Sequence, residues 1–381
     1  MTIAPNLLGA VALAIWLAML LGRDGFWLAR ATDRVVPPLP DTLPSVTAIV
    51  PARDEAECIG AAVASLVAQR YAGRFDILVV DDGSSDGTAL LARRAAAGSP
   101  RLAVMTAAPL ANGWTGKLAA MAQGVAHSAT HEPSDLIWFT DADIVHAPDT
   151  LASLVARAHQ DGRVLVSLMA RLRCESLAER MLVPAFVFFF QLLYPFAAVS
   201  DPRRRVAGAA GGCMLVDRGA LARAGGIAAI RSALIDDCAL GALMKRQGPI
   251  WLGLTDRARS IRPYPRFGDI GAMIARSAYA QLGYRPLWLA GTVVGMAIVY
   301  VAPPALALFA TGWAQAAGLA AWALMALALL PMLRFYRCSP LWGLALPGIA
   351  AFYAGATLYS AWQFTRGRGG AWKGRHQAVM P

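Results

Sequence analysis

The segment FDILVVDDGSSDG, from Phe75 to Gly87, decides the fold class. An apolar run typical of a buried strand ends there in two acids and a glycine-containing turn. LIWFTDAD at residues 136–143 has the same form, and VTAIVPA at residues 46–52 is a third short β-rich run. Between residues 55 and 70, apolar side chains recur at helical spacing. Strands alternating with helices predict an α/β fold with a Rossmann-like, mostly parallel sheet.

The composition indicates a membrane protein. Hydrophobic residues make up 57% of the 381 residues, charged residues only 15%, and the formal net charge is +11. Soluble domains contain about 25% charged residues. A basic chain suits nucleic acid, but long apolar runs at both ends favour a membrane and no nucleic-acid partner. The five scattered cysteines form no C-x-x-C pair, which argues against a zinc site or a disulfide framework.

The N-terminal part reads as an anchor and a linker. Residues 1–22 are apolar enough for a transmembrane segment, and arginines follow at 23, 30 and 34. The positive-inside bias then places the N-terminus outside and the next segment in the cytoplasm. A cleaved signal peptide is the alternative. Residues 23–44 form a linker with a Pro-rich end, and residues 45–270 form the globular domain.

The C-terminal part is apolar again over residues 285–364. Residues 287–333 are long enough for two transmembrane segments, and residues 341–362 for a third, interrupted at Pro347 and Gly348. Three full spans would leave the basic tail, residues 365–381, outside the cell, whereas a re-entrant last segment would return it to the cytoplasm. We favour the cytoplasmic tail. The apolar run near residues 176–199 is expected to be a helix at the membrane interface.

Acidic residues follow two of the predicted strands. Asp82 follows the strand at residues 75–80, and ligands bind open α/β sheets at the carboxyl ends of strands. A simple capped turn is the alternative. Residues i and i+2 of a strand point to one side, so Asp141 and Asp143 are expected to project together. Mg²⁺ or Mn²⁺ would offset their repulsion, since such ions take one or two carboxylates and substrate phosphates. A solvated turn is the alternative.

Two further motifs carry charge at helix starts. Asp236 and Asp237 precede a helical pattern, where the helix dipole favours acids, and one of them can serve as a proton acceptor. Lys117 in GWTGKLAAMAQG opens an Ala-rich helix, and a helix N-terminus with a lysine attracts phosphate. A solvated surface lysine is the alternative.

These motifs, in this order, resemble the family 2 glycosyltransferases, which have the nucleotide-sugar-binding GT-A fold. PARDE at residues 51–55 resembles the family's Pro-x-x-Asn-Glu, with Asp54 in place of Asn. The resemblance implies metal binding by Asp141 and Asp143, and catalysis by Asp237 as the base beside Asp236, which replaces the usual Glu. It also implies that six residues bind the nucleotide sugar, with Asp82 on uracil: Pro51, Arg53, Glu55, Asp82, Lys117 and Asp141.

A narrower resemblance concerns the acceptor. The anchor, the C-terminal segments and the motifs GWTGKLAAMAQG, LIDDCALG and WKGR are similar to bacterial hopanoid-associated glycosyltransferases. The Gln-x-x-Arg-Trp motif of processive relatives is not apparent, although Arg276 stands near its place. The resemblance implies inverting transfer of one sugar, from a UDP-linked donor to a lipid, with a hopanoid as one candidate. It also implies a multi-pass protein of a bacterial inner membrane with a cytoplasmic catalytic domain. The alternatives are a polyprenyl phosphate or glycerolipid acceptor, or a non-catalytic membrane partner that keeps the fold.

Overall fold

The structure is a computed structural model that describes residues 3–130 and 132–376. The anchor expected over residues 1–22 and the tail expected over residues 365–381 therefore fall partly outside the described residues. The chain divides into two compact units. The sheet unit consists of Ala31–Arg173 and Phe196–Pro263. The helical unit consists of the described residues up to Arg30, Cys174–Pro195, and those from Tyr264 onward.

Within the described residues, the sheet unit contains an eight-stranded sheet of order β3-β2-β1-β4-β7-β6-β8-β5. Strands β3, β2, β1 and β4 run parallel to one another, and β6 runs parallel to β8. Strand β7 runs antiparallel to both β4 and β6, and β5 runs antiparallel to β8. The predicted α/β, mostly parallel GT-A sheet is confirmed. The strands are β1 (Val46–Ala52), β2 (Phe75–Asp81), β3 (Leu102–Thr106), β4 (Leu136–Thr140), β5 (Ile144–His146), β6 (Leu165–Arg171), β7 (Cys213–Asp217) and β8 (Ile250–Ser260).

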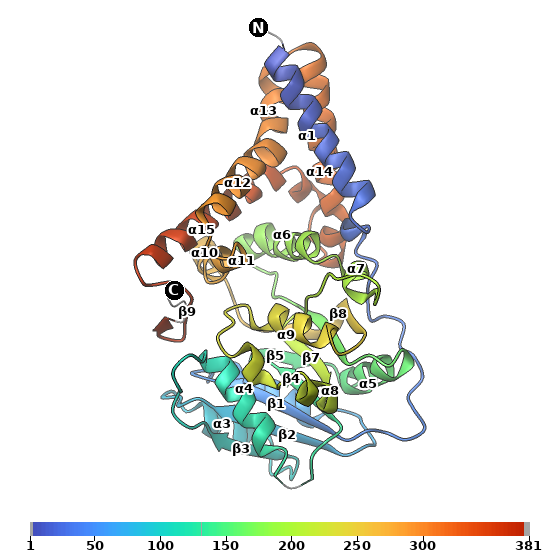
Figure 1. Cartoon of the computed structure of the whole chain (residues 1–381), viewed down its shortest axis with the longest axis vertical. Coiled ribbons are helices and arrows are strands. Elements are labelled where there is room, and N and C mark those ends of the chain that lie inside the picture. The colour runs from blue at the N-terminus through green and yellow to red at the C-terminus, as the bar shows by residue number, and fades with distance from the viewer. Residues whose placement is uncertain (1–2, 131, 377–381) are drawn as a thin grey trace. The chain divides into compact units, whose positions relative to one another are not determined.

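Helices cover both faces of this sheet, which explains why its strands are continuous apolar runs. On one face the alternate residues Val46, Ala48 and Val50 of β1 join the core with Ile59 and Val63 of α2. On the other face α4 crosses β1 and β2 (Figure 1). The helical elements are α2 (Ile59–Val67), α3 (Thr88–Ala95), α4 (Gly116–His127), α5 (Thr150–Gln160), α7 (Phe196–Ser200), α8 (Arg218–Arg223), η2 (Ile227–Ile230) and α9 (Asp236–Lys245).

Glycine allows α4 to approach the sheet closely. A Cβ atom at Gly124 would lie 2.6 Å from Cγ2 of Ile49 and 3.1 Å from Cγ2 of Val80, closer than packed side chains tolerate. Since α4 begins at Gly116, beside the carboxyl ends of β1 and β2, this contact sets where its first turn lies relative to the strand ends. The packing of α4 therefore positions the side chain of Lys117.

The helical unit contains the long apolar helices. Its elements are α1 (Ile3–Gly22), η1 (Phe26–Leu28), α6 (Leu177–Leu193), α10 (Phe267–Ala275), α11 (Ala278–Gln281), α12 (Pro286–Met296), η3 (Ala297–Val301), α13 (Ala302–Phe309), α14 (Gly312–Phe335), η4 (Pro340–Gly343), α15 (Leu346–Thr365), β9 (Ala371–Trp372) and β10 (Arg375–His376). Three helices of the described chain are long and apolar enough to cross a membrane: Ile3–Gly22, Pro286–Phe309 and Gly312–Phe335.

Small residues pack these three helices together, as is common between helices in membranes (Figure 1). A Cβ atom at Gly318 of α14 would lie 2.7 Å from the carbonyl oxygen of Pro303, and one at Gly9 of α1 would lie 3.1 Å from Cβ of Ala317. The carbonyl of Val299 has no α-helical partner, because residue 303 is a proline without an N–H, and Trp16 Nε1 donates to Val299 O at 2.9 Å. The unit is thus a specifically packed bundle.

One expectation differs from this structure. The helix α15 begins at Leu346, so Pro347 lies in its first turn, where proline is tolerated, and the expected bend at Pro347 and Gly348 is wrong. This helix is not among the three candidate spans of the described chain. The helix expected near residues 176–199 is α6, followed by α7 in the other unit. α6 buries Leu182 and Phe188 within the helical unit, where Tyr353 Oη donates to Leu182 O at 3.0 Å.

Candidate active site

The paired ends of β1 and β2 bring Arg53 and Asp82 together. The strands are in register through Ala52 and Asp81, and the amide of Asp82 donates to Ala52 O at 2.8 Å. Arg53 Nη1 donates to Asp82 O at 2.5 Å and lies 4.0 Å from a carboxylate oxygen of Asp82. Two of the residues expected to bind the nucleotide therefore share the carboxyl edge of the sheet.

Asp54 joins the loops that follow β1 and β2. Its φ angle is +49°, in the left-handed region where Asp and Asn are the most common residues after glycine. Asp54 Oδ1 accepts from Ser85 N at 2.9 Å, and Asp54 N donates to Ser84 Oγ at 2.9 Å. The next amide, that of Glu55, donates to Thr88 Oγ1 at 2.8 Å. These bonds explain why an aspartate can replace asparagine at this position.

Pro51 lies inside β1, opposite Val80 of β2. The pairing of β1 with β4 ends at Ile49 and Phe139, so the missing N–H of Pro51 removes no bond from that ladder. Pro51 therefore marks the residue at which β1 separates from β4, just before the loop that carries Arg53.

Lys117 lies between two acids. It is in the first turn of α4, where the helix dipole disfavours a cation. Its Nζ atom lies 2.8 Å from Asp141 Oδ1 and 3.0 Å from Asp236 Oδ2. Burial alone would lower the pKa of the Lys117 ammonium, but the carboxylates of Asp141 and Asp236 outweigh burial and raise that pKa above its ordinary value. Lys117 is therefore a permanent cation in this cluster.

The strand alternation expected for Asp141 and Asp143 is wrong. Strand β4 ends at Thr140, and the two acids lie in a turn closed by a bond from Ile144 N to Asp141 O at 3.2 Å, so strand alternation does not apply. Burial and then the charge of Asp143 raise the pKa of the Asp141 carboxyl, against the opposing effect of Lys117.

Asp143 is held by a different cation from Asp141. Its Oδ2 atom accepts from Ser260 Oγ at 2.9 Å and from Arg262 Nε at 3.1 Å. Arg262 Nη2 also lies 2.5 Å from Oε2 of Glu55, a residue expected to bind the donor. No cation is near the two acids in sequence, but the fold supplies one to each: Lys117 to Asp141 and Arg262 to Asp143.

Two buried residues bracket the turn that carries Asp141 and Asp143. Thr140 Oγ1 donates to Gly212 O at 2.9 Å and lies 2.8 Å from Nε2 of His146. A hydroxyl has one hydrogen to donate, so the Thr140 oxygen accepts from a protonated Nε2. Burial lowers the pKa of His146 to about 3, which keeps this imidazole neutral. His146 therefore supports the turn without contributing charge.

Asp237 has the features of a general base. It lies in the first turn of α9, where Oδ2 accepts from Gly211 N at 3.0 Å and Oδ1 from Cys238 N at 2.7 Å. Burial and the adjacent Asp236 raise the pKa of the Asp237 carboxyl to about 6, and Lys117 opposes this shift. A carboxylate with a pKa close to working pH is suited to accept a proton.

Gly211 was not identified from the sequence, although the segment GAAGGC contains it. A Cβ atom at this position would lie 3.2 Å from Lys117 Nζ and 3.4 Å from Cβ of Asp237. Ser260 and Arg262 were also missed, because Ser260 ends β8 and Arg262 follows it, in a segment without a recognisable motif. The only available signal was the pair of glycines at 211 and 212 before a buried strand.

The site residues form connected groups. Lys117, Asp141, Asp236 and Asp237 form one group, and Glu55, Asp143, Ser260 and Arg262 form a second, joined to it through the turn at residues 141–143. Arg53 and Asp82 form a third pair, which reaches the second group through the loop at residues 53–55.

A divalent ion fits this arrangement when the substrate supplies further ligands. Across residues 3–130 and 132–376, no group of three His, Cys, Asp or Glu side chains is placed to hold a metal ion. Asp141 and Asp143 offer two carboxylates, and Mg²⁺ is typically bound by one or two carboxylates together with phosphates. The donor set therefore suits an ion that arrives with a diphosphate.

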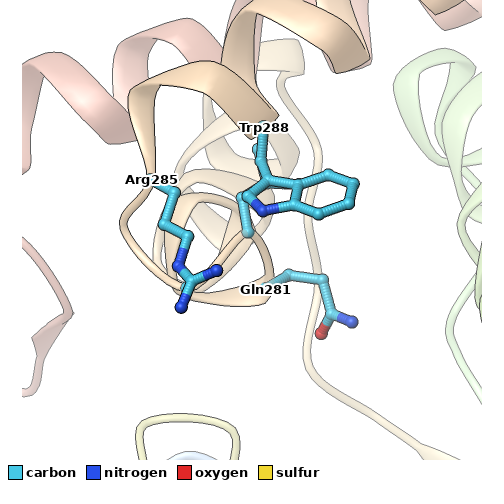
Figure 2. Close-up of a pocket in the computed structure, with 5 residues that line it drawn as sticks. Gln281, Arg285 and Trp288 are labelled. Carbon is cyan, nitrogen blue, oxygen red and sulfur yellow. The ribbon is translucent and has the colours of Figure 1, made fainter.

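A separate pocket lies in the helical unit. It is lined by Gln281, Leu282, Gly283, Arg285 and Trp288, at the start of the candidate span Pro286–Phe309. Figure 2 shows the side chains of Gln281, Arg285 and Trp288 around this open depression. Arginine and tryptophan are the residue types enriched where a transmembrane helix meets the membrane surface.

The mostly parallel sheet has the GT-A fold, a class of nucleotide-sugar-binding folds. The model of the family described as Glycosyl transferase family 2 matches residues 47–225, so this part of the chain is a family 2 glycosyltransferase domain. The fold is similar to that of a mannosyltransferase from Pyrobaculum calidifontis, PcManGT, solved with GDP-Man and Mn²⁺. The TM-score is 0.56 at 21% identity, over 94% of this chain and 99% of the other.

Curated relatives match shorter segments. An N-acetylglucosaminyltransferase of Rhizobium leguminosarum bv. viciae is 32% identical over 161 residues, which cover 40% of this chain and 35% of the relative. A 4,4'-diaponeurosporenoate glycosyltransferase of Staphylococcus aureus is 39% identical over 101 residues, which cover 26% of this chain and 24% of the relative. The matched segment spans about a third or less of these relatives.

Proposed function

We propose that this protein is a membrane-bound inverting glycosyltransferase that moves one sugar from a UDP-linked donor to the hydroxyl of a lipid. The observation that carries the proposal is the placement of Asp237, with a pKa of about 6, beside the group of Lys117, Asp141 and Asp236. A base can take the proton of the attacking hydroxyl, and a cation can stabilise the negative charge that develops on a departing phosphate.

The reaction is a single displacement. The hydroxyl oxygen of the acceptor attacks the anomeric carbon, the bond from this carbon to the phosphate oxygen breaks, and the nucleoside diphosphate leaves with the electron pair. Asp237 accepts the hydroxyl proton on a carboxylate oxygen. Because there is one displacement, the anomeric configuration inverts.

Other residues of the chain bind and orient the donor. Lys117 is placed to bind the diphosphate, and Arg53 and Asp82 to bind the nucleotide, with Asp82 on uracil. Pro51 sets the path of their loop. Asp141 and Asp143 would hold Mg²⁺ or Mn²⁺, which when bound offsets the negative charge growing on the departing diphosphate. We assign Glu55 to Arg262, which it contacts, and not to the donor.

The helical unit supports a membrane location and a lipid acceptor. With the N-terminus outside, the candidate spans Ile3–Gly22, Pro286–Phe309 and Gly312–Phe335 return the chain to the cytoplasm. The sheet unit and the basic tail are then both cytoplasmic, and the external turn at residues 310–311 carries no charge. This arrangement agrees with the positive-inside bias and removes the conflict that a third C-terminal span would create.

The acceptor class is the finer part of the proposal. We propose a hopanoid, from the resemblance of the sequence motifs, with polyprenyl phosphate or glycerolipid as the alternative. One relative is named for 4,4'-diaponeurosporenoate, which supports an apolar acceptor. The alternative to an enzymatic function is a non-catalytic membrane partner that keeps the fold.

Membranes containing the protein, incubated with labelled nucleotide sugars, test the proposal. Mass analysis of the lipid extract should show one added sugar on one lipid class, and Asp237→Asn should abolish the product. Asp76→Asn, a change to an exposed acid on β2, is the matched control and should retain activity. Product confined to the aqueous phase would exclude a lipid acceptor. Equal cellular function of the wild type and Asp237→Asn would support the alternative of a non-catalytic membrane partner.

A further inference from the structure

We propose that Arg262 and Ser260, supported by Glu55, are positioning residues that orient Asp143 toward a divalent ion. None of the motifs that suggested the active site contains Ser260 or Arg262. The inference rests on the proposed function, because the ion is expected to arrive with the diphosphate of the donor.

The two carboxylate oxygens of Asp143 have different surroundings. Oδ2 accepts two hydrogen bonds, from Ser260 Oγ and from Arg262 Nε, whereas Oδ1 accepts none from the described residues. The backbone is held as well, since Ile261 N donates to Asp143 O at 2.9 Å. The segment at residues 260–262 therefore fixes both the main chain and one oxygen of Asp143, and leaves Oδ1 available to a ligand.

Glu55 adjusts the charge of this arrangement. Arg262 lies between two carboxylates, 2.5 Å from Glu55 Oε2 and 3.1 Å from Asp143 Oδ2. The side chains of Glu55 and Asp143 are only 10% and 14% exposed, so solvent screens the three charges weakly. One cation between two anions leaves a net charge of −1. Asp143 is thus held in place without losing its attraction for a cation.

The shape of the arginine side chain matters. A guanidinium is planar and donates from several nitrogens in a fixed geometry, which allows Nε and Nη2 to contact two acids at once. A lysine has a single ammonium and would retain the charge but lose one of the two contacts. Bound metals depend on such outer hydrogen bonds, whose loss typically costs about 10–100-fold in affinity or activity.

The test measures Mn²⁺ binding directly, by electron paramagnetic resonance of the purified full chain in detergent with UDP present. We expect Arg262→Lys and Ser260→Ala to raise the Kd for Mn²⁺ by about 10–100-fold. Saturating Mn²⁺ should restore most of the kcat of both variants. Arg171→Lys is the matched control, because Arg171 Nη1 contacts Asp256 Oδ1 at 2.7 Å in the same sheet unit, and it should bind Mn²⁺ as the wild type does.

Unchanged Mn²⁺ affinity in folded Ser260→Ala and Arg262→Lys would overturn the inference. If Arg262→Lys unfolds, Ser260→Ala decides the question, since it removes a single hydrogen bond. Wild-type protein that transfers sugar but binds no Mn²⁺ would also overturn the inference and leave the proposed function intact. Absence of sugar transfer with any donor would overturn the function itself.

Discussion

The ammonium of Lys117 lies 2.8 Å from Oδ1 of Asp141. This contact joins the first turn of α4 to the turn that follows β4. The same ammonium contacts Asp236 at the start of α9. One lysine thus connects three elements distant in sequence, at the edge where the diphosphate is proposed to bind. The electrostatics of the site depend on this residue, because without it three acids would face one another.

Replacing Lys117 should therefore destabilise the sheet unit, because the carboxylates of Asp141 and Asp236 would repel each other. We expect Lys117→Gln to lower the thermal midpoint, since Asp141 and Asp236 lose their shared cation. Asp236→Asn in the same chain should recover part of the loss, with a coupling free energy of about 0.5–3 kcal/mol. Thermal unfolding of the two single variants and the double variant measures this coupling. Strictly additive effects would contradict the shared role of Lys117.

The pH dependence of the reaction should report on Asp237. Burial and Asp236 raise its pKa to about 6, and the base must be deprotonated, so kcat/KM should increase with pH and level off above that value. Removing a negative neighbour favours the charged form, so Asp236→Asn should move the midpoint to lower pH. Initial rates across a pH series check both expectations. A midpoint that stays fixed in Asp236→Asn would exclude Asp237 as the titrating group.

Gly211 should be sensitive to a single added methyl group. The Cβ atom of Gly211→Ala would lie 3.2 Å from Lys117 Nζ and 3.4 Å from Asp237 Cβ, so both side chains have to move. We expect kcat to fall by about tenfold or more, because small displacements of catalytic groups are costly. Gly60→Ala is the control: it lies in α2 with nothing within 4 Å of the new atom, and activity should be retained. Equal activity of the two variants would contradict this role of Gly211.

Helix packing in the helical unit should depend on Gly318. A Cβ atom there would lie 2.7 Å from the Pro303 carbonyl oxygen, so Gly318→Leu forces α13 and α14 apart. We expect a lower thermal midpoint in detergent and less protein recovered from membranes. Gly295→Leu, where nothing lies within 4 Å of the new Cβ atom, provides the comparison. Similar midpoints for the two variants would show that the close contact is unimportant.

The sequence predicted the parts of the site that depend on local pattern. An apolar run that ends in acid predicted that Asp82 and Asp141 lie at the carboxyl edge of the sheet, because that edge follows from strand direction. The first-turn positions of Lys117 and of Asp236 follow in the same way from helical spacing. The contact between Lys117 and Asp236 could not be predicted from helical spacing, since it depends on how α4 and α9 pack against a common sheet.

The errors have similar causes. Asp141 and Asp143 were treated as strand residues, but β4 ends one residue earlier, and no local signal distinguishes a strand end from a turn there. Arg262 was missed because its partners, Glu55 and Asp143, are distant in sequence. The bend expected at Pro347 was wrong because proline is as compatible with a helix start as with a break.

The order of segments along the chain restricts how the protein can be shortened. The sheet unit is discontinuous, because Cys174–Pro195, with the apolar helix α6, belongs to the helical unit. A fragment that simply ends after Pro263 would retain α6 but lack α15, against which it packs. Expression of the sheet unit alone therefore requires a polar linker in place of Cys174–Pro195, in addition to removal of the segments before Ala31 and after Pro263.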